Sequence, residues 1–212
     1  MREVRRGGER FRTDGEGTRT WHSFSYGAHY DPDNLGFGAL QAINEEHVAP
    51  GAGYDEHRHR DVEIVTWVLE GALAHADTTG AQGVIEPGTA QRLSAGTGVE
   101  HAERNASQLE PLVFVQVMLR SEHAAEPRYA CVDVEGPGLL ETVDVAADAR
   151  LLVARPDGGI LSVPPAPRTL VHTTRGPLVV DGLELGAGDE VRTDEPVERV
   201  AGHGEALLWL LR

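Results

Sequence analysis

Lysine is absent from this sequence, because all nineteen basic residues are arginine. Schiff-base chemistry on the protein and a phosphate-binding loop with its lysine are therefore excluded. The single cysteine, Cys131, rules out an internal disulfide and a CxxC redox or zinc motif. No stretch approaches 18 apolar residues, and the charged first twenty residues lack the apolar core of a secretory signal. We therefore expect a soluble, cytoplasmic protein.

The formal net charge is −15, which argues against binding of DNA or RNA through a basic surface and against docking on an anionic membrane. Long stretches of helical periodicity are also missing. In their place stand 25 glycines and 12 prolines spread along the 212 residues, a distribution typical of many short strands joined by tight turns. The length allows one large β domain or two small ones.

One stretch concentrates groups that can bind a metal. Residues 62–69 are rich in β-branched and apolar residues, which predicts a buried strand. The residues just before it include His57 and His59. If the strand begins there, positions 57, 59, 61 and 63 share a face, because side chains alternate along a strand. Glu63 would then lie beside the two imidazoles, in a catalytic role or orienting one of them.

A second cluster lies about forty residues later, where His101, Glu103 and Asn105 would share a face of another strand. Together, His57, His59, His101 and Glu103 offer three neutral nitrogens and one carboxylate oxygen. Such a set leaves two positions open on an octahedral ion and is close to the arrangement in non-haem Fe(II) oxygenases. Asn105 is either a site residue or a turn-former.

The second half of the chain repeats the first in outline. Residues 175–189 have the same strand, glycine and turn order as residues 70–88, and the apolar run 206–211 parallels 112–119. We therefore predict an all-β protein with an N-terminal metal-binding domain at 1–125 and a linker with a second domain at 126–212. Residues 1–20 are expected to be partly disordered. His203-x-Glu205 has no His-x-His partner upstream and is predicted to be a surface loop.

These motifs resemble a known family. The stretch from His57-x-His59 to Glu63, followed by Pro87-Gly88 and by His101 with Asn105, resembles the two motifs of the cupin superfamily. More narrowly, residues 20–120 resemble the pirin-type bicupins. The resemblance implies two stacked cupin (jelly-roll-like) β-barrels, with one metal ion in the N-terminal barrel held by His57, His59, His101 and Glu103. It also implies that Glu63 is not a metal ligand.

The resemblance further implies a quercetin 2,3-dioxygenase-like oxidoreductase that cleaves a flavonol, or a related enol or catechol, with O2. Fe(II) is the expected ion, with Mn, Co, Ni, Cu and Zn as alternatives. Glu103 and Glu63 are the expected catalytic carboxylates, and Glu103 would accept the substrate proton. One alternative function is that of an iron-binding, redox-sensitive regulatory protein that acts through protein partners. Another is isomerisation of a sugar or a keto acid. We expect a monomer. A roomy open pocket would favour catalysis.

Overall fold

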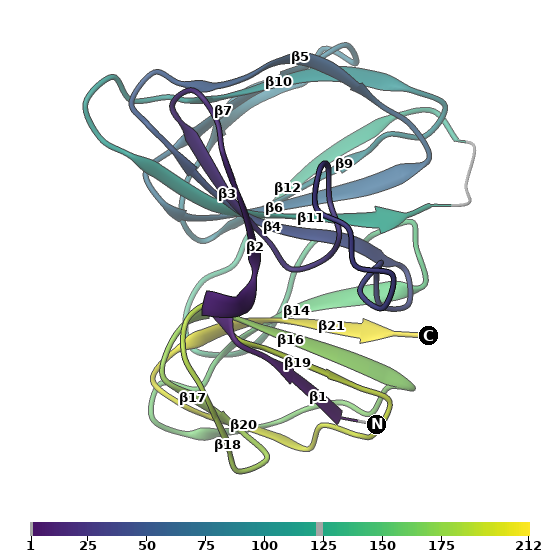
Figure 1. Cartoon of the computed structure of the whole chain (residues 1–212), viewed down its shortest axis with the longest axis vertical. Coiled ribbons are helices and arrows are strands. Elements are labelled where there is room, and N and C mark those ends of the chain that lie inside the picture. The colour runs from purple at the N-terminus through teal and green to yellow at the C-terminus, as the bar shows by residue number, and fades with distance from the viewer. Residues whose placement is uncertain (1, 122–124) are drawn as a thin grey trace. The chain divides into compact units, whose positions relative to one another are not determined.

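The computed structural model describes residues 2–121 and 125–212, and its regular structure is almost entirely β-strand (Figure 1). One short 3-10 helix, η1 (Gly7–Glu9), is the exception within these ranges. The chain divides into two compact units. The site unit comprises residues 11–133 and 145–147, and the companion unit comprises the first ten residues with 134–144 and 148–212. Within the described ranges, no helix is long and apolar enough to cross a membrane.

The site unit is built from a seven-stranded and a four-stranded antiparallel sheet, which appear as two layers in Figure 1. The larger sheet has the order β12-β9-β6-β11-β4-β3-β2 and consists of β2 (Phe11–Asp14), β3 (Thr18–His22), β4 (Leu40–Val48), β6 (Val62–Glu70), β9 (Thr89–Ser94), β11 (Leu112–Arg120) and β12 (Arg128–Asp133). The smaller sheet has the order β5-β10-β7-β8 and consists of β5 (Gly53–His59), β7 (Leu73–Asp77), β8 (Gln82–Ile85) and β10 (Val99–Asn105).

The companion unit repeats this arrangement with shorter strands. Its larger sheet has the order β1-β19-β16-β21-β14-β13 and consists of β1 (Arg2–Arg5), β13 (Gly138–Glu141), β14 (Ala149–Arg155), β16 (Arg168–Arg175), β19 (Glu190–Thr193) and β21 (Glu205–Leu211). Its smaller sheet has the order β15-β20-β17-β18 and consists of β15 (Ile160–Ser162), β17 (Leu178–Val180), β18 (Leu183–Leu185) and β20 (Arg199–Gly202). The two sets of sheet orders correspond closely, which confirms the all-β fold and the repeat seen in the sequence.

The core of the site unit leaves a polar zone in its middle. One cluster of buried apolar side chains includes Leu112 and Phe114 of β11, and another includes Ile64 and Leu93 with Met118 packed against it. Between them, the same inward faces carry the buried polar residues Thr66, Gln91 and Gln116. Burial of these apolar side chains between the two sheets holds the sheets together. The buried polar residues between the two clusters mark where a ligand could be bound.

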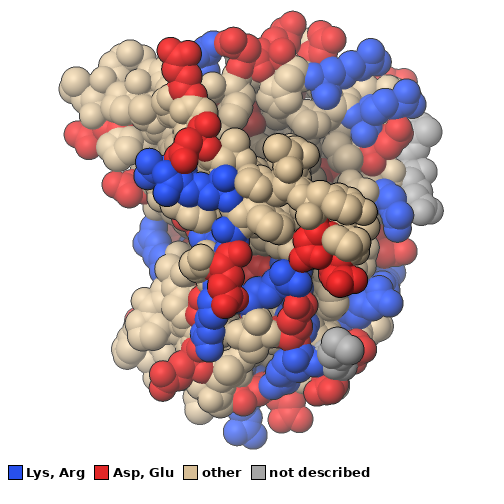
Figure 2. All heavy atoms as spheres, viewed as in Figure 1, with Lys and Arg blue, Asp and Glu red and all other residues tan. Residues whose placement is uncertain are grey.

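The expectation of disorder in residues 1–20 is wrong for residues 2–20, the part of this range that the structure describes. β1 pairs with β19, and the β2–β3 hairpin extends the larger sheet of the site unit beside β4. Arg2 and Arg6 form ion pairs with Asp181 and Asp189, at N–O distances of 2.9 and 2.6 Å. Arginines are likewise interspersed with acidic side chains over the face seen in Figure 2. Local composition cannot reveal these partners, because they lie far along the chain.

Substituting Gly53 by alanine is expected to destabilise the site unit by about 1–3 kcal/mol, the usual cost of overpacking. A Cβ at this position would lie 2.3 Å from the backbone oxygen of Glu103 and 2.6 Å from the Cα of Arg104. Chemical denaturation of the metal-free protein would measure the loss. Gly83→Ala is the matched control, because a Cβ there meets no atom within 4 Å. Equal stabilities of the two variants would contradict the prediction.

Candidate metal centre

Two neighbouring strands of the smaller sheet bring the predicted ligands together. β5 and β10 pair antiparallel, with His57 opposite His101 and His59 opposite Val99. Directly opposed residues share a face of the sheet, so all three imidazoles lie on the same side. A register shift follows between His101 and Glu103, and it places Glu103 opposite Tyr54. The extra residue lies on β5, between Tyr54 and His57, so β10 keeps its regular alternation and Glu103 stays on the face of His101.

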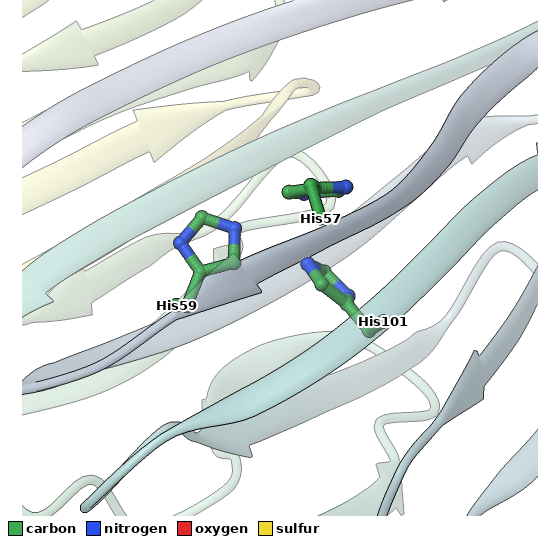
Figure 3. Close-up of side chains that lie close together, drawn as sticks. All are labelled: His57, His59 and His101. Carbon is green, nitrogen blue, oxygen red and sulfur yellow. The ribbon is translucent and has the colours of Figure 1, made fainter.

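The three imidazoles lie close together (Figure 3). The ring centroid of His57 is 4.9 Å from that of His59 and 4.4 Å from that of His101, and the last two are 5.0 Å apart. One ligand atom from each ring lies within 4.8 Å of the others. Glu103 belongs to a second, overlapping group with His101 and His75. The four predicted ligands therefore form two groups that share His101.

Unpartnered buried atoms show that these residues fit a metal ion. His59 Nε2, both ring nitrogens of His101 and Glu103 Oε1 are buried without a hydrogen-bond partner among the described residues. Leaving such atoms unsatisfied costs about 1–3 kcal/mol each, so buried polar groups normally have partners. A cation would satisfy nitrogen lone pairs and a carboxylate oxygen at once. The donor set is that of a divalent transition metal.

Hydrogen bonds orient two of the ligands. His57 Nδ1 donates to the carbonyl of Asp55 at 2.8 Å, which leaves Nε2 with its lone pair for a metal. Gln116 Nε2 donates to Glu103 Oε2 at 2.8 Å, so the second oxygen, Oε1, remains to bind a cation. Such outer partners fix the tautomer and direction of a ligand.

Burial sets the charge of the site in the absence of a cation. It lowers the pKa of His59 to about 4 and that of His101 to about 3, with the neighbouring histidines adding to the effect. Both imidazoles are therefore neutral near pH 7, as metal ligation requires. Burial also raises the pKa of Glu103 to about 7, although the Gln116 hydrogen bond opposes this. A bound cation would favour the ionised carboxylate.

His75 is a neighbour of the cluster that the sequence patterns did not assign to the site. It is buried on β7 directly opposite Glu103, and its ring centroid lies 5.4 Å from that of His101. Its Nε2 lies 3.0 Å from Asp77 Oδ2 and its Nδ1 lies 3.1 Å from Gln91 Nε2. Both nitrogens are thus engaged, and His75 supports the site from behind. A signal for this position was available in the sequence. His75 is two residues from the apolar Leu73, so on a strand both side chains point to the same, buried face.

Glu63 does not join the cluster. The strand expected through residues 57–63 is broken, because β5 ends at His59 and Asp61 has a φ of +57°. β6 then carries Glu63 into the other sheet, where its Oε2 accepts hydrogen bonds from Ser94 Oγ at 2.8 Å and Ala146 N at 3.1 Å. Its place in the structure gives it a role in holding residues 145–147 onto the site unit.

Asn105 organises a turn. Its side-chain nitrogen donates to the carbonyls of Val48, Ala49 and Glu110, and its oxygen accepts from Ser107 N at 2.9 Å. Of the two roles considered for Asn105, the turn-forming one accounts for these contacts.

A pocket of about 630 Å³ opens onto the cluster, a size usual for small-molecule sites. Its lining includes His57, His59 and Glu103. Further residues come from the inward faces of the larger sheet and from the loop after β3: Thr20, His22, Tyr26, Asn44, Glu46, Gln116 and Met118. The rings of His22 and Tyr26 stack at 5.1 Å with an interplanar angle of 18°, which gives the pocket a flat aromatic wall. The sequence patterns assigned no site role to Thr20, His22, Tyr26, Asn44, Glu46 or Gln116.

The corresponding interior of the companion unit is apolar. β17 and β20 pair as β7 and β10 do, with Val180 opposite Val200 where His75 is opposite Glu103. Both valines are fully buried in the apolar core of that unit. His203 is exposed in the loop after β20, and Glu205 bonds Arg155 at 2.8 Å. The His203-x-Glu205 spacing therefore does not reproduce the site.

Comparison with known proteins identifies the family. The model of the Pirin family matches residues 4–119. A Mycobacterium bovis protein named as a candidate quercetin 2,3-dioxygenase is 39% identical over 98% of this chain and 93% of its own. The Escherichia coli quercetin 2,3-dioxygenase is 41% identical over 52% of this chain and 48% of its own.

A solved structure of bacterial pirin YhhW from Escherichia coli, in complex with nickel(II), superposes with a TM-score of 0.91. It is 29% identical and the match covers 100% of this chain and 99% of the other. The matches in sequence and in fold agree, and both include the strands that carry the histidine cluster. The chain belongs to the pirin family.

Proposed function

We propose that this protein is a metal-dependent dioxygenase of the quercetinase type, acting on a flavonol or on a related planar enol or catechol. The observation that carries the proposal is the set of unpartnered buried donor atoms of His59, His101 and Glu103 beside an open pocket of about 630 Å³. Relatives named as quercetin 2,3-dioxygenases support the reaction class. A roomy pocket at the site favours catalysis over a purely regulatory role.

His57, His59, His101 and Glu103 would hold the ion, which we propose to be Fe(II). When bound, a divalent ion would supply positive charge that lowers the pKa of a substrate hydroxyl, and iron would supply electrons for the reaction with O2. The nickel complex of a relative shows that a member of the family accepts a different ion. The choice of Fe(II) for this chain is therefore itself proposed.

The residues of the pocket wall suit a flat substrate. The stacked rings of His22 and Tyr26 offer an aromatic face, and Met118 offers an apolar one. Asn44 and Glu46 lie on the same inward face and can meet substrate hydroxyls. His22 is itself fixed, because its Nδ1 lies 2.9 Å from Asn44 Oδ1. Planar polyphenols have both a flat aromatic ring system and hydroxyl groups, which these two kinds of wall residue can bind.

Anaerobic loading with Fe(II) followed by exposure to air and quercetin is expected to give O2 uptake with loss of the flavonol absorbance. His57→Ala should remove turnover, since it deletes the nitrogen left free by the Asp55 hydrogen bond. Parallel loading with Ni, Mn, Co, Cu and Zn would identify the active ion. Stoichiometric metal without turnover of any flavonol or catechol would overturn the proposal.

A further inference from the structure

We propose that Glu46, and not the metal-binding Glu103, is the residue that accepts the proton of the substrate hydroxyl. This deepens the function proposed above and rests on it. Two carboxylates, Glu46 and Glu103, are buried in the wall of the same pocket, and the exposed Asp55 and Glu56 lie at its rim. The buried pair differs in what holds each oxygen, and that difference assigns the roles.

Position in the sheet aims Glu46 into the pocket. It lies on β4 between β3 and β11, opposite Thr20 and Phe114. Asn44, two residues earlier on the same strand, also lines the pocket, as the alternation of a strand requires. The intervening Glu45 is on the other face, where its carboxylate lies 2.8 Å from His47 Nε2.

Hydrogen bonds on one oxygen leave the other available. Thr20 Oγ1 and Tyr54 OH both donate to Glu46 Oε2, each at 2.5 Å. Oε1 accepts no hydrogen bond from the described residues, although Glu46 lines the pocket. Tyr54 stands opposite Glu103 on the strand that carries His57 and His59, so it ties Glu46 to the histidine cluster. Glu46 is thus held in place with one oxygen open to a ligand.

Glu103 is less suited to this task. Its Oε2 accepts from Gln116 and its Oε1 is the unpartnered atom that a cation would take. Accepting a proton would require Glu103 to give up one of these interactions. Glu46 can accept a proton on Oε1 and keep both hydrogen bonds on Oε2, so no ligand has to be released.

The surroundings of Glu46 favour a base stronger than an ordinary carboxylate. Burial raises its pKa, and Glu45 adds to this, while the hydrogen bonds from Thr20 and Tyr54 and the nearby His47 oppose it. Burial raises the pKa values of Tyr26, Tyr54 and Glu103, and the negative charge of Glu46 adds to each of these shifts. Tyr54 therefore stays protonated and remains a donor. A general base works best when its pKa lies near the working pH.

The proposed step is one proton transfer. The O–H bond of the substrate breaks, its electron pair stays on the substrate oxygen, and a new O–H bond forms at Glu46 Oε1. The substrate becomes an anion and Glu46 becomes neutral, so charge is conserved. No oxidant is used in this step. It precedes the reaction with O2 and can be observed without oxygen.

The test compares Glu46→Gln with Glu45→Gln, the same change on the opposite face of the same strand. Metal content should be unchanged in both. Under anaerobic conditions, quercetin bound to the metal-loaded parent should show the red-shifted absorbance of the ionised flavonol, and quercetin bound to Glu46→Gln should show that of the neutral form. In air, kcat/KM should fall by about 10²–10⁴-fold in Glu46→Gln, the usual contribution of a general base. The loss should shrink as the pH passes the pKa of the free flavonol.

Tyr54→Phe provides a second measurement. It tests whether Glu46 is the proton acceptor even if Glu46→Gln fails to bind metal. Because the Tyr54 hydrogen bond lowers the pKa of Glu46, its removal should move the acidic limb of the kcat/KM profile to higher pH. The role of Glu46 would be overturned if the acidic limb did not move, or if Glu46→Gln ionised and turned over quercetin like the parent. Either result would still be compatible with the proposed dioxygenase activity. A parent protein that turns over no flavonol or catechol would remove both proposals together.

Discussion

Replacing His101 by alanine is expected to leave the protein unable to retain a metal ion. His101 is the residue shared by both groups of ligating side chains, and neither of its buried nitrogens has a partner among the described residues. Loss of an outer partner of a metal ligand costs about 10–100-fold in affinity. Loss of His101 itself should exceed about 100-fold and reduce metal content from one ion per chain to a small fraction.

Elemental analysis after gel filtration would measure the metal content, and thermal unfolding would give an independent readout. A ligand at about 1,000 times its Kd stabilises the folded state by about 4 kcal/mol, so Fe(II) or Ni(II) should raise the Tm of the parent and not that of His101→Ala. The control is His203→Ala, since His203 has the same two-residue spacing to a glutamate but lies on an exposed loop of the companion unit. Full metal retention by His101→Ala would place the metal elsewhere.

Metal-free protein is expected to lose stability, relative to Glu103→Gln, as the pH rises from about 4.5 to about 7. Burial raises the pKa of Glu103 from 4.5 to about 7, so the folded state holds a proton that the unfolded state has released over this range. Unfolding then becomes easier as the pH increases. A shift of this size corresponds to about 3 kcal/mol. Saturating metal should abolish the effect, because a cation favours the carboxylate.

The histidines make the opposite contribution in the same protein. Burial lowers the pKa of His59 to about 4 and that of His101 to about 3, so the unfolded state binds more protons between these values and 6.5. Stability from these groups therefore rises with pH through that range. Urea denaturation at half-unit pH steps would separate the histidine contribution from that of Glu103. The stability of Glu103→Gln should still rise with pH because of the histidines, but it should lack the decrease caused by Glu103. Parallel curves for the two proteins would contradict the prediction.

The parts of the site that follow from a single strand were predictable. His57 with His59, and His101 with Glu103, are spaced by two residues on strands, and alternation alone places each pair on one face. The fold class followed from the turn residues and from apolar runs such as 112–119. The chemistry of the two pairs together predicted one donor set for a metal, and the family resemblance implied the same four ligands.

What depended on a turn or on distant pairing was not predictable. The reversal at Asp61, where φ is positive, moves Glu63 from the predicted face into the other sheet. His75 enters the site only because β7 pairs with β10, and Glu46 only because β4 lies between β3 and β11. These are facts of sheet order, which no local window of the sequence contains.

The pairing of β1 with β19 has a consequence for how the chain is made. Arg2–Arg5 lie opposite Glu190–Thr193 at the edge of the larger sheet of the companion unit. During synthesis from the N-terminus, this strand must wait until almost the whole chain has left the ribosome before its partner exists. Strands with such long separations in sequence fold late. The site unit, whose strands all lie between Phe11 and Asp133, can complete its sheets while the edge strand of the companion unit is still unpaired.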